Sequence, residues 1–136
     1  MVSKLDQSIN FNRQALGLRA YRQQVLAANI ANADTPGFKA RDIDFNAALQ
    51  SALAGKGPAD LPLATTSSRH VAGSVDSSPA SLFYRTSHQP SADGNTVDMD
   101  VERTQITENA MQYQVLTQLI SDKFRGMRSA LASTNS

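Results

Sequence analysis

The residue types that most often perform chemistry are few and poorly placed in this sequence. The two histidines, His70 and His88, stand beside serines, and neither has a second histidine or a carboxylate at metal-ligand spacing. None of the serines sits in a Gly-x-Ser-x-Gly motif. The 136-residue chain contains no cysteine, which excludes thiol catalysis, thiolate metal sites and disulfides within it. We therefore expect no enzyme, no cofactor and no small-molecule substrate.

Three acidic residues have a spacing that resembles a cation site. Asp98, Asp100 and Glu102 alternate along the chain, but the surrounding sequence lacks the glycine and the distal glutamate of a calcium-binding loop. They precede a long helical pattern, where negative charge interacts favourably with the helix dipole. We interpret them as acids at a helix N-terminus.

Arginines recur along the N-terminal region, at Arg13, Arg19 and Arg22, as they do on some nucleic-acid-binding surfaces. The formal net charge is only +1, and this region lacks the repeated aromatic interleaving that nucleic-acid recognition would need. We expect no nucleic acid partner. The arginines should pair with acids of neighbouring subunits or remain solvated.

Two long stretches have the periodicity of amphipathic helices, because apolar residues recur at steps of three or four. In the first, from about residue 5 to 32, these residues are Phe11, Ala15, Leu18, Tyr21, Val25 and Ala28. In the second, from about residue 99 to 131, they are Ile106, Ala110, Tyr113, Leu116, Ile120, Phe124, Met127 and Leu131. Four of the second set repeat every seven residues, as in a coiled coil. The sequence predicts an all-α dominated fold in which the two terminal helices form a coiled-coil-like hairpin.

The region between the helices is expected to be largely irregular. Residues 51–91 are rich in serine and threonine and show no sustained period, although residues 81–85 have the composition of a short strand or a docking patch. This organisation predicts one discontinuous domain, in which two helices far apart in the sequence pack together. It comprises an N-terminal axial helix (1–35), an extended arm with an irregular connection (36–96) and a C-terminal axial helix (97–136).

The first helix is terminated by Thr35-Pro36-Gly37, because proline cannot continue a helix and glycine permits the chain to turn. The arm that follows, residues 38–45, alternates only loosely between apolar and charged residues. Neither side of it is uniformly apolar, which favours a segment that adds its edge to a neighbouring molecule over a buried strand.

The apolar stripes of the two helices are broader than one helix pair can cover, so we expect both helices to need neighbours from outside the chain. The isolated chain should be only marginally ordered at its ends. The residues expected at subunit interfaces are Phe11, Leu18, Val25, Arg41, Asp42, Ile106, Tyr113, Leu116, Ile120, Phe124 and Met127.

The end of the first helix carries an Asn-x-x-Asn-x-x-Thr-Pro-Gly-Phe motif, formed by Asn29, Asn32, Thr35, Pro36, Gly37 and Phe38. The motif resembles that of the bacterial flagellar axial proteins, the family of rod, hook and hook-associated subunits. Phenylalanine replaces the commoner tyrosine at its last position. Residues 41–45 and 93–100 make the resemblance more specific, to a short proximal rod protein. It covers about residues 5–48 and 79–131.

The resemblance implies a structural subunit of the proximal rod in the flagellar basal body, within the periplasm. Its partners would be other rod subunits, further copies of itself, the MS ring with its rod adaptor, and the flagellar type III export apparatus. Export without a cleavable signal peptide is expected, since the N-terminal sequence lacks the apolar core of such a signal. Two alternatives remain open: a neighbouring proximal rod protein of the same family, and a soluble helical adaptor or export chaperone.

Overall fold

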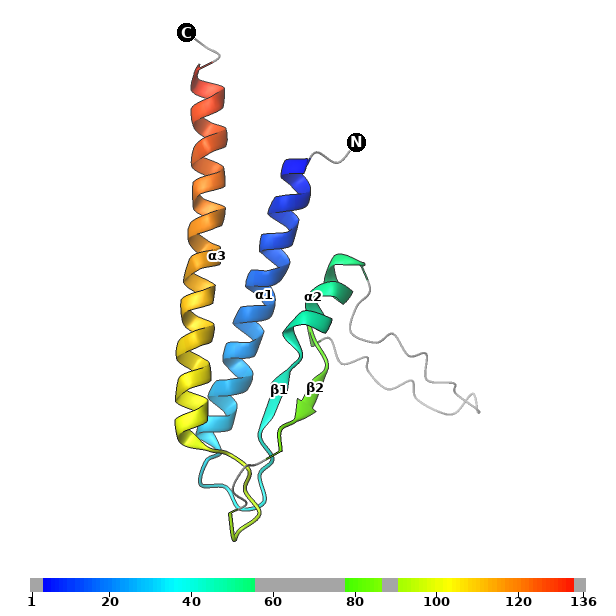
Figure 1. Ribbon diagram of the computed structural model, residues 1–136, viewed down its shortest axis with the longest axis vertical. Coiled ribbons are helices and arrows are strands. Elements are labelled where there is room, and N and C mark those ends of the chain that lie inside the picture. The colour runs from blue at the N-terminus through cyan, green and yellow to red at the C-terminus, as the bar shows by residue number, and fades with distance from the viewer. Residues whose placement is uncertain (1–3, 56–77, 87–90, 134–136) are drawn as a thin grey trace, which may run out of the picture.

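Two long helices, α1 (Lys4–Ala31) and α3 (Met99–Ser133), lie side by side with opposite chain directions and form a hairpin (Figure 1). This computed structural model describes residues 4–55, 78–86 and 91–133. Between the two helices the chain forms three short elements: strand β1 (Arg41–Ile43), helix α2 (Phe45–Leu53) and strand β2 (Leu82–Tyr84). The predicted hairpin of terminal helices is confirmed.

The start of α3 is fixed by a side chain, as its acidic N-terminal sequence predicts. Asp98 Oδ1 accepts hydrogen bonds from the backbone N–H groups of Asp100 (3.0 Å) and Val101 (3.2 Å), which have no partner inside the helix. From this end α3 runs past the N-terminal end of α1, so its last turns lie beyond the helix pair (Figure 1).

The arm after Gly37 packs against other parts of the same chain. Its residues 41–43 form β1, which pairs with β2 in antiparallel register, Asp42 opposite Phe83. The expectation that the arm adds its edge to a neighbouring molecule was therefore wrong for these residues, because a strand of the same chain occupies that position. The expectation of a short strand within residues 81–85 is confirmed by β2.

Helix α2 was not expected, because it lies across the boundary between the arm and the irregular region. Asp44 caps it by accepting a hydrogen bond from the backbone N–H of Ala47 (3.0 Å). One face of α2 packs against a small apolar cluster formed by α1, β1 and the residues before β2. The members of this cluster and its neighbours are Leu18, Ile43, Ala80, Tyr21, Phe45, Ala48 and Leu49.

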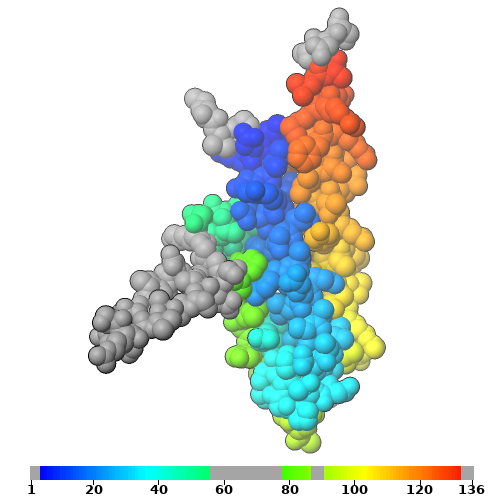
Figure 2. Space-filling view, turned by 180° about the vertical axis from the view of Figure 1, so that it is seen from behind, coloured from blue at the N-terminus to red at the C-terminus, as the bar shows by residue number. Residues whose placement is uncertain are grey.

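Buried side chains are concentrated toward the end of the hairpin where α1 meets the start of α3. On α3 the fully buried residues are Glu102 and Asn109, and from residue 110 to 132 no side chain is buried. Several large apolar residues of that stretch are exposed, among them Val115 (59%), Phe124 (55%) and Leu131 (70%). Figure 2 shows α1 between α3 on one side and α2 with β2 on the other, so among the described elements α1 is the main neighbour of α3.

We call the end with the buried residues the closed end and the opposite end, where α1 begins and α3 ends, the open end. Among the described residues, no helix is both long and apolar enough to cross a membrane.

Shortening the chain after Ser121 should change the free energy of unfolding by less than about 1 kcal/mol, because the deleted part of α3 contributes no buried side chain. Asn109→Ala should be more damaging, with a loss of about 2 kcal/mol. It removes an amide that donates to the Arg19 carbonyl (2.9 Å) and the Gln23 side chain (2.8 Å). Urea unfolding followed by circular dichroism measures both. A truncated chain less stable than the Asn109 variant would contradict this distribution of stability.

Candidate functional site

The motif residues after α1 meet the loop before α3, and the side chain of Asn95 holds the two together. Asn95 is 4% exposed, and its amide nitrogen lies 3.0 Å from the carbonyl oxygen of Asn32 and 2.8 Å from those of Ala33 and Thr35. These carbonyls follow the last turn of α1, where the helix itself offers no donors. One side chain from the α3 side therefore satisfies the backbone at the end of α1.

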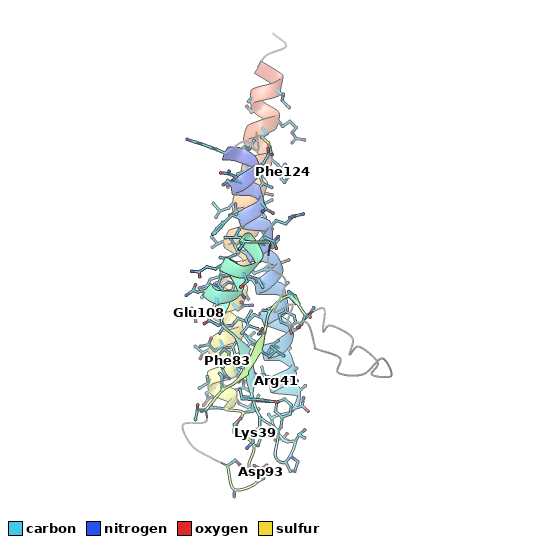
Figure 3. The ribbon with its side chains drawn as sticks, turned by 90° about the vertical axis from the view of Figure 1, so that its right-hand side faces the viewer. Lys39, Arg41, Phe83, Asp93, Glu108 and Phe124 are labelled. Carbon is cyan, nitrogen blue, oxygen red and sulfur yellow. The ribbon has the colours of Figure 1, made fainter. Side chains whose placement is uncertain are left out.

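Two glycines allow the backbones of these loops to approach each other. Gly37 has φ 71° and Gly94 has φ 77°, a region that other residues adopt only with strain. Gly37 N donates to the Asp93 carbonyl (3.0 Å), and Thr96 N donates to the Phe38 carbonyl (3.0 Å). Figure 3 shows Asp93 and Lys39 together at this tip of the molecule. The Pro-Gly part of the motif is thus one half of a loop-to-loop contact.

Asn29, the first motif residue, joins three elements from a position that is 1% exposed. Its amide nitrogen donates to the Arg41 carbonyl (2.7 Å), and its amide oxygen accepts from Arg41 N (3.0 Å), so the side chain pairs with β1 as a neighbouring strand would. The same nitrogen lies 3.2 Å from Glu102 Oε2 on α3. Replacing Asn29 would remove one link between α1 and β1 and one between α1 and α3.

A cluster of two arginines and two carboxylates completes the closed end. Arg22 on α1 binds Asp42 on β1 in bidentate geometry, with Nε–Oδ1 and Nη2–Oδ2 distances of 2.8 Å, and also donates to Gln105 on α3 (2.7 Å). Arg85, after β2, pairs with Glu102 on α3 and lies 3.8 Å from Asp42. The carboxylates are 5% and 0% exposed, so each buried charge depends on its partner.

The hydrogen bond to Asp42 raises the pKa of Arg22 above its ordinary value. The expectation that this arginine pairs with a neighbouring subunit was therefore wrong: its partner is in the same chain. Arg19 is placed differently, with its guanidinium carbon 3.6 Å from the centre of the Phe45 ring. Burial, followed by the positive charge of Arg22, lowers the pKa of Arg19.

The closed end is built from hydrogen bonds and ion pairs that connect separate elements. In residues 4–55, 78–86 and 91–133, no three histidine, aspartate or glutamate side chains gather in a way that could hold a metal ion. His70 and His88 lie outside the described residues. What the arrangement does is mechanical, because it fixes the register and spacing of α1, β1, β2 and α3 through directional bonds.

The structure divides the residues that were expected at subunit interfaces into three groups. Those buried inside the chain, and hence without surface to offer a neighbour, are Leu18, Val25 and Asp42. Those half-buried are Arg41, Ile106, Leu116, Ile120 and Met127. Those exposed are Phe11, Tyr113 and Phe124. Within the motif, Asn29 is buried, Asn32 and Phe38 are half-buried, and Thr35, Pro36 and Gly37 are exposed.

Four residues of the closed end were not identified from the sequence: Arg85, Asn95, Glu102 and Asn109. A signal was present for two of them. Glu102 and Asn109 are seven residues apart and lie on the same helical face as Leu116, so they are polar residues within an apolar stripe. Polar residues at such positions require partners. Arg85 and Asn95 carried no comparable signal, since their partners lie on other elements or loops that the sequence does not place beside them.

Asn95→Ala is expected to lower the free energy of unfolding by about 2 kcal/mol, because it leaves the Ala33 carbonyl without a donor and removes one of the two donors to the Asn32 and Thr35 carbonyls. Asn46→Ala, on the exposed surface of α2, is the matched control and should change stability by less than about 0.5 kcal/mol. The urea midpoints of the two variants give the comparison. Equal midpoints would refute the role assigned to Asn95.

Arg22→Met should cost about 3 kcal/mol of unfolding free energy, since it leaves the Asp42 carboxylate buried with a weaker partner. Arg13→Met removes an exposed arginine from the same helix, where it only bonds Asn10, and should be nearly neutral. Thermal and urea unfolding measure both changes. The ion-pair account fails if Arg22→Met is as stable as Arg13→Met.

Comparison with known proteins agrees with this arrangement. A family model described as flagella basal body rod protein matches residues 9–39, which cover most of α1 and the motif after it. Flagellar basal body rod protein FlgB of Escherichia coli is 49% identical over 99% of this chain and 100% of its own length. The FlgB protein of Salmonella typhimurium is 47% identical with the same coverage, and that of Aeromonas hydrophila is 42% identical over 96% of this chain and 97% of its own. The chain therefore belongs to the FlgB family of flagellar basal body rod proteins.

Proposed function

We propose that this chain is a structural subunit of the proximal flagellar rod, which assembles by packing its terminal helices against those of neighbouring subunits. The observation that supports this most directly is the open end of α3. Residues 110–132 form a regular helix with no buried side chain and with large apolar residues exposed. A helix of this kind gains its stability from tertiary packing, which here must come from other chains.

Apolar grooves lie on both sides of the contact between α1 and α3, which allows two neighbours at once. One groove is lined by Leu16, Ile120, Phe124, Met127 and Leu131 together with polar residues of α3. The other is lined by Phe11, Phe45, Leu49, Met111, Val115 and their neighbours. Val115 and Phe124 are nine residues apart, so at about 100° per residue they point in opposite directions. Two different faces favour a head-to-tail assembly, as a rod requires.

The family places the subunit in a functional context. We infer that it sits in the basal body rod, contacts copies of itself and other rod subunits, and links the MS ring and its adaptor to the distal rod. The flagellar type III apparatus would export it unfolded. The names of the full-length relatives favour this function over the neighbouring proximal rod protein FlgC and over a soluble helical adaptor or export chaperone.

Phe124→Asp tests assembly through the open end. Phe124 is 55% exposed in the free chain, so the isolated variant should keep its helix content. Its free energy of unfolding in urea should change by less than about 1 kcal/mol. In the rod the new carboxylate would be desolvated at a contact between helices, a penalty of several kcal/mol in every copy. We expect cells that carry only this variant to lack rods and motility, as judged by swimming assays and electron microscopy of basal bodies.

Ser129→Asp is the matched control, because it adds the same charge to an exposed position of α3 that lies outside both grooves. It should swim normally. Normal swimming by the Phe124 variant, at an equal level of the protein, would rule out the open end of α3 as an assembly surface.

A further inference from the structure

The outer edge of β2 offers backbone hydrogen-bonding groups that the described residues leave unused. Arg85 N donates to the Ala40 carbonyl (2.9 Å), which identifies this pair as hydrogen-bonded in the antiparallel ladder. Hydrogen-bonded pairs alternate with pairs that are not bonded. The N–H and C=O groups of Phe83, two residues before Arg85, therefore also point toward β1. Leu82 and Tyr84 therefore point their N–H and C=O groups away from β1, toward the free side of the sheet.

At the opposite edge of the sheet, the outward backbone groups of β1 do have hydrogen-bond partners. On β1 the alternation turns the N–H and C=O groups of Arg41 outward, and both are bound by the Asn29 side chain, at 3.0 and 2.7 Å. Within residues 4–55, 78–86 and 91–133, no group plays the part of Asn29 for β2. One edge of the sheet is closed by α1 and the other is open.

The side chains of β2 are unusual for an open edge. Leu82 is 37% exposed, Phe83 46% and Tyr84 71%, so three consecutive large apolar or aromatic residues face solvent. Exposed edges are normally protected by lysine, proline or a bulge, because an unprotected apolar edge pairs with other extended chains. Helix α3 of a neighbour cannot use this edge, since a helix has no free backbone groups along its length. Only an extended segment has free backbone groups that can pair with this edge.

Charge next to the edge adds a second requirement. Arg41 is opposite Tyr84 and shares its face of the sheet, and Figure 3 places Arg41 beside Phe83 near the closed end. Unlike Arg22 and Arg85, Arg41 has no carboxylate partner among the described residues. An acidic side chain adjacent to Tyr84 on an added strand would lie two strand spacings, roughly 10 Å, from the Arg41 backbone. The long side chains of arginine and glutamate can span that distance.

We propose that the outer edge of β2 is a docking site for an extended segment of a neighbouring rod subunit, added as a third strand. The segment carries an apolar residue against Phe83 and an acidic residue on the face of Arg41. This contact is separate from the helix faces and rests on the proposed function only for the source of the segment.

A synthetic peptide tests the site without a rod. The probe is acetylated, amidated Thr-Glu-Val-Val-Thr, added to the isotope-labelled full chain, with the glutamine analogue as the control for charge. We expect the peptide to shift the amide resonances of Leu82 and Tyr84 and to slow their hydrogen exchange about tenfold. Phe83, whose amide already faces β1, should change little. The glutamine peptide should bind more weakly, because it cannot pair with Arg41.

Two variants separate edge pairing from general apolar binding. Tyr84→Pro removes an outward N–H that the β1–β2 ladder does not use, so the fold should persist while peptide binding is lost. Tyr84→Thr keeps the N–H and should retain binding. The proposal is overturned if the Leu82 and Tyr84 amides of the free chain exchange as slowly as Phe83, if the peptide causes no shift, or if the proline variant binds as well as the threonine variant. None of these results bears on the Phe124→Asp test, so the two proposals fail separately.

Discussion

The bidentate ion pair between Arg22 and Asp42 is the contact on which the rest of the structure depends. It connects α1 to β1, and through Gln105 and Arg85 the same two side chains reach α3 and β2. Among the described residues the apolar cluster has three buried members, so directional polar bonds have to supply the order that a large core would supply elsewhere. Buried charges are tolerable only when all their partners are in place, which makes the closed end form as a unit.

This constraint explains why the molecule has two dissimilar ends. At the closed end, Asn29, Asn95 and the arginine–carboxylate cluster satisfy the backbone and side chains internally. Toward the open end the helices continue with regular geometry but without burial. Both properties suit the assembly into a rod that we propose. The closed end fixes α1 and α3 relative to each other, and the open end leaves apolar surface exposed.

Sequence reasoning predicted the parts of the fold that are governed by local periodicity. The stripe from Ile106 to Met127 was enough to place α3, and Thr35-Pro36-Gly37 was enough to end α1 close to its observed boundary. It failed where long-range pairing decides the structure. In the sequence, Asp42 is one of several charges in a loosely alternating arm. Only the structure shows that it is buried and paired with Arg22. The short β1 and β2 carry too few residues for a period of two to be visible, and Asn95 depends on carbonyls some sixty positions away.

The proposed assembly requires a free chain that is firmly folded at the closed end and is completed by other subunits at the open end. Native-state hydrogen exchange of the dilute, unassembled chain tests it residue by residue. Amides of residues 18–31 and 99–109 should exchange about a hundredfold more slowly, relative to their unfolded rates, than those of residues 117–133. Equal protection along the whole of α3 in the dilute chain would contradict it, because the open end would then need no neighbour to become ordered.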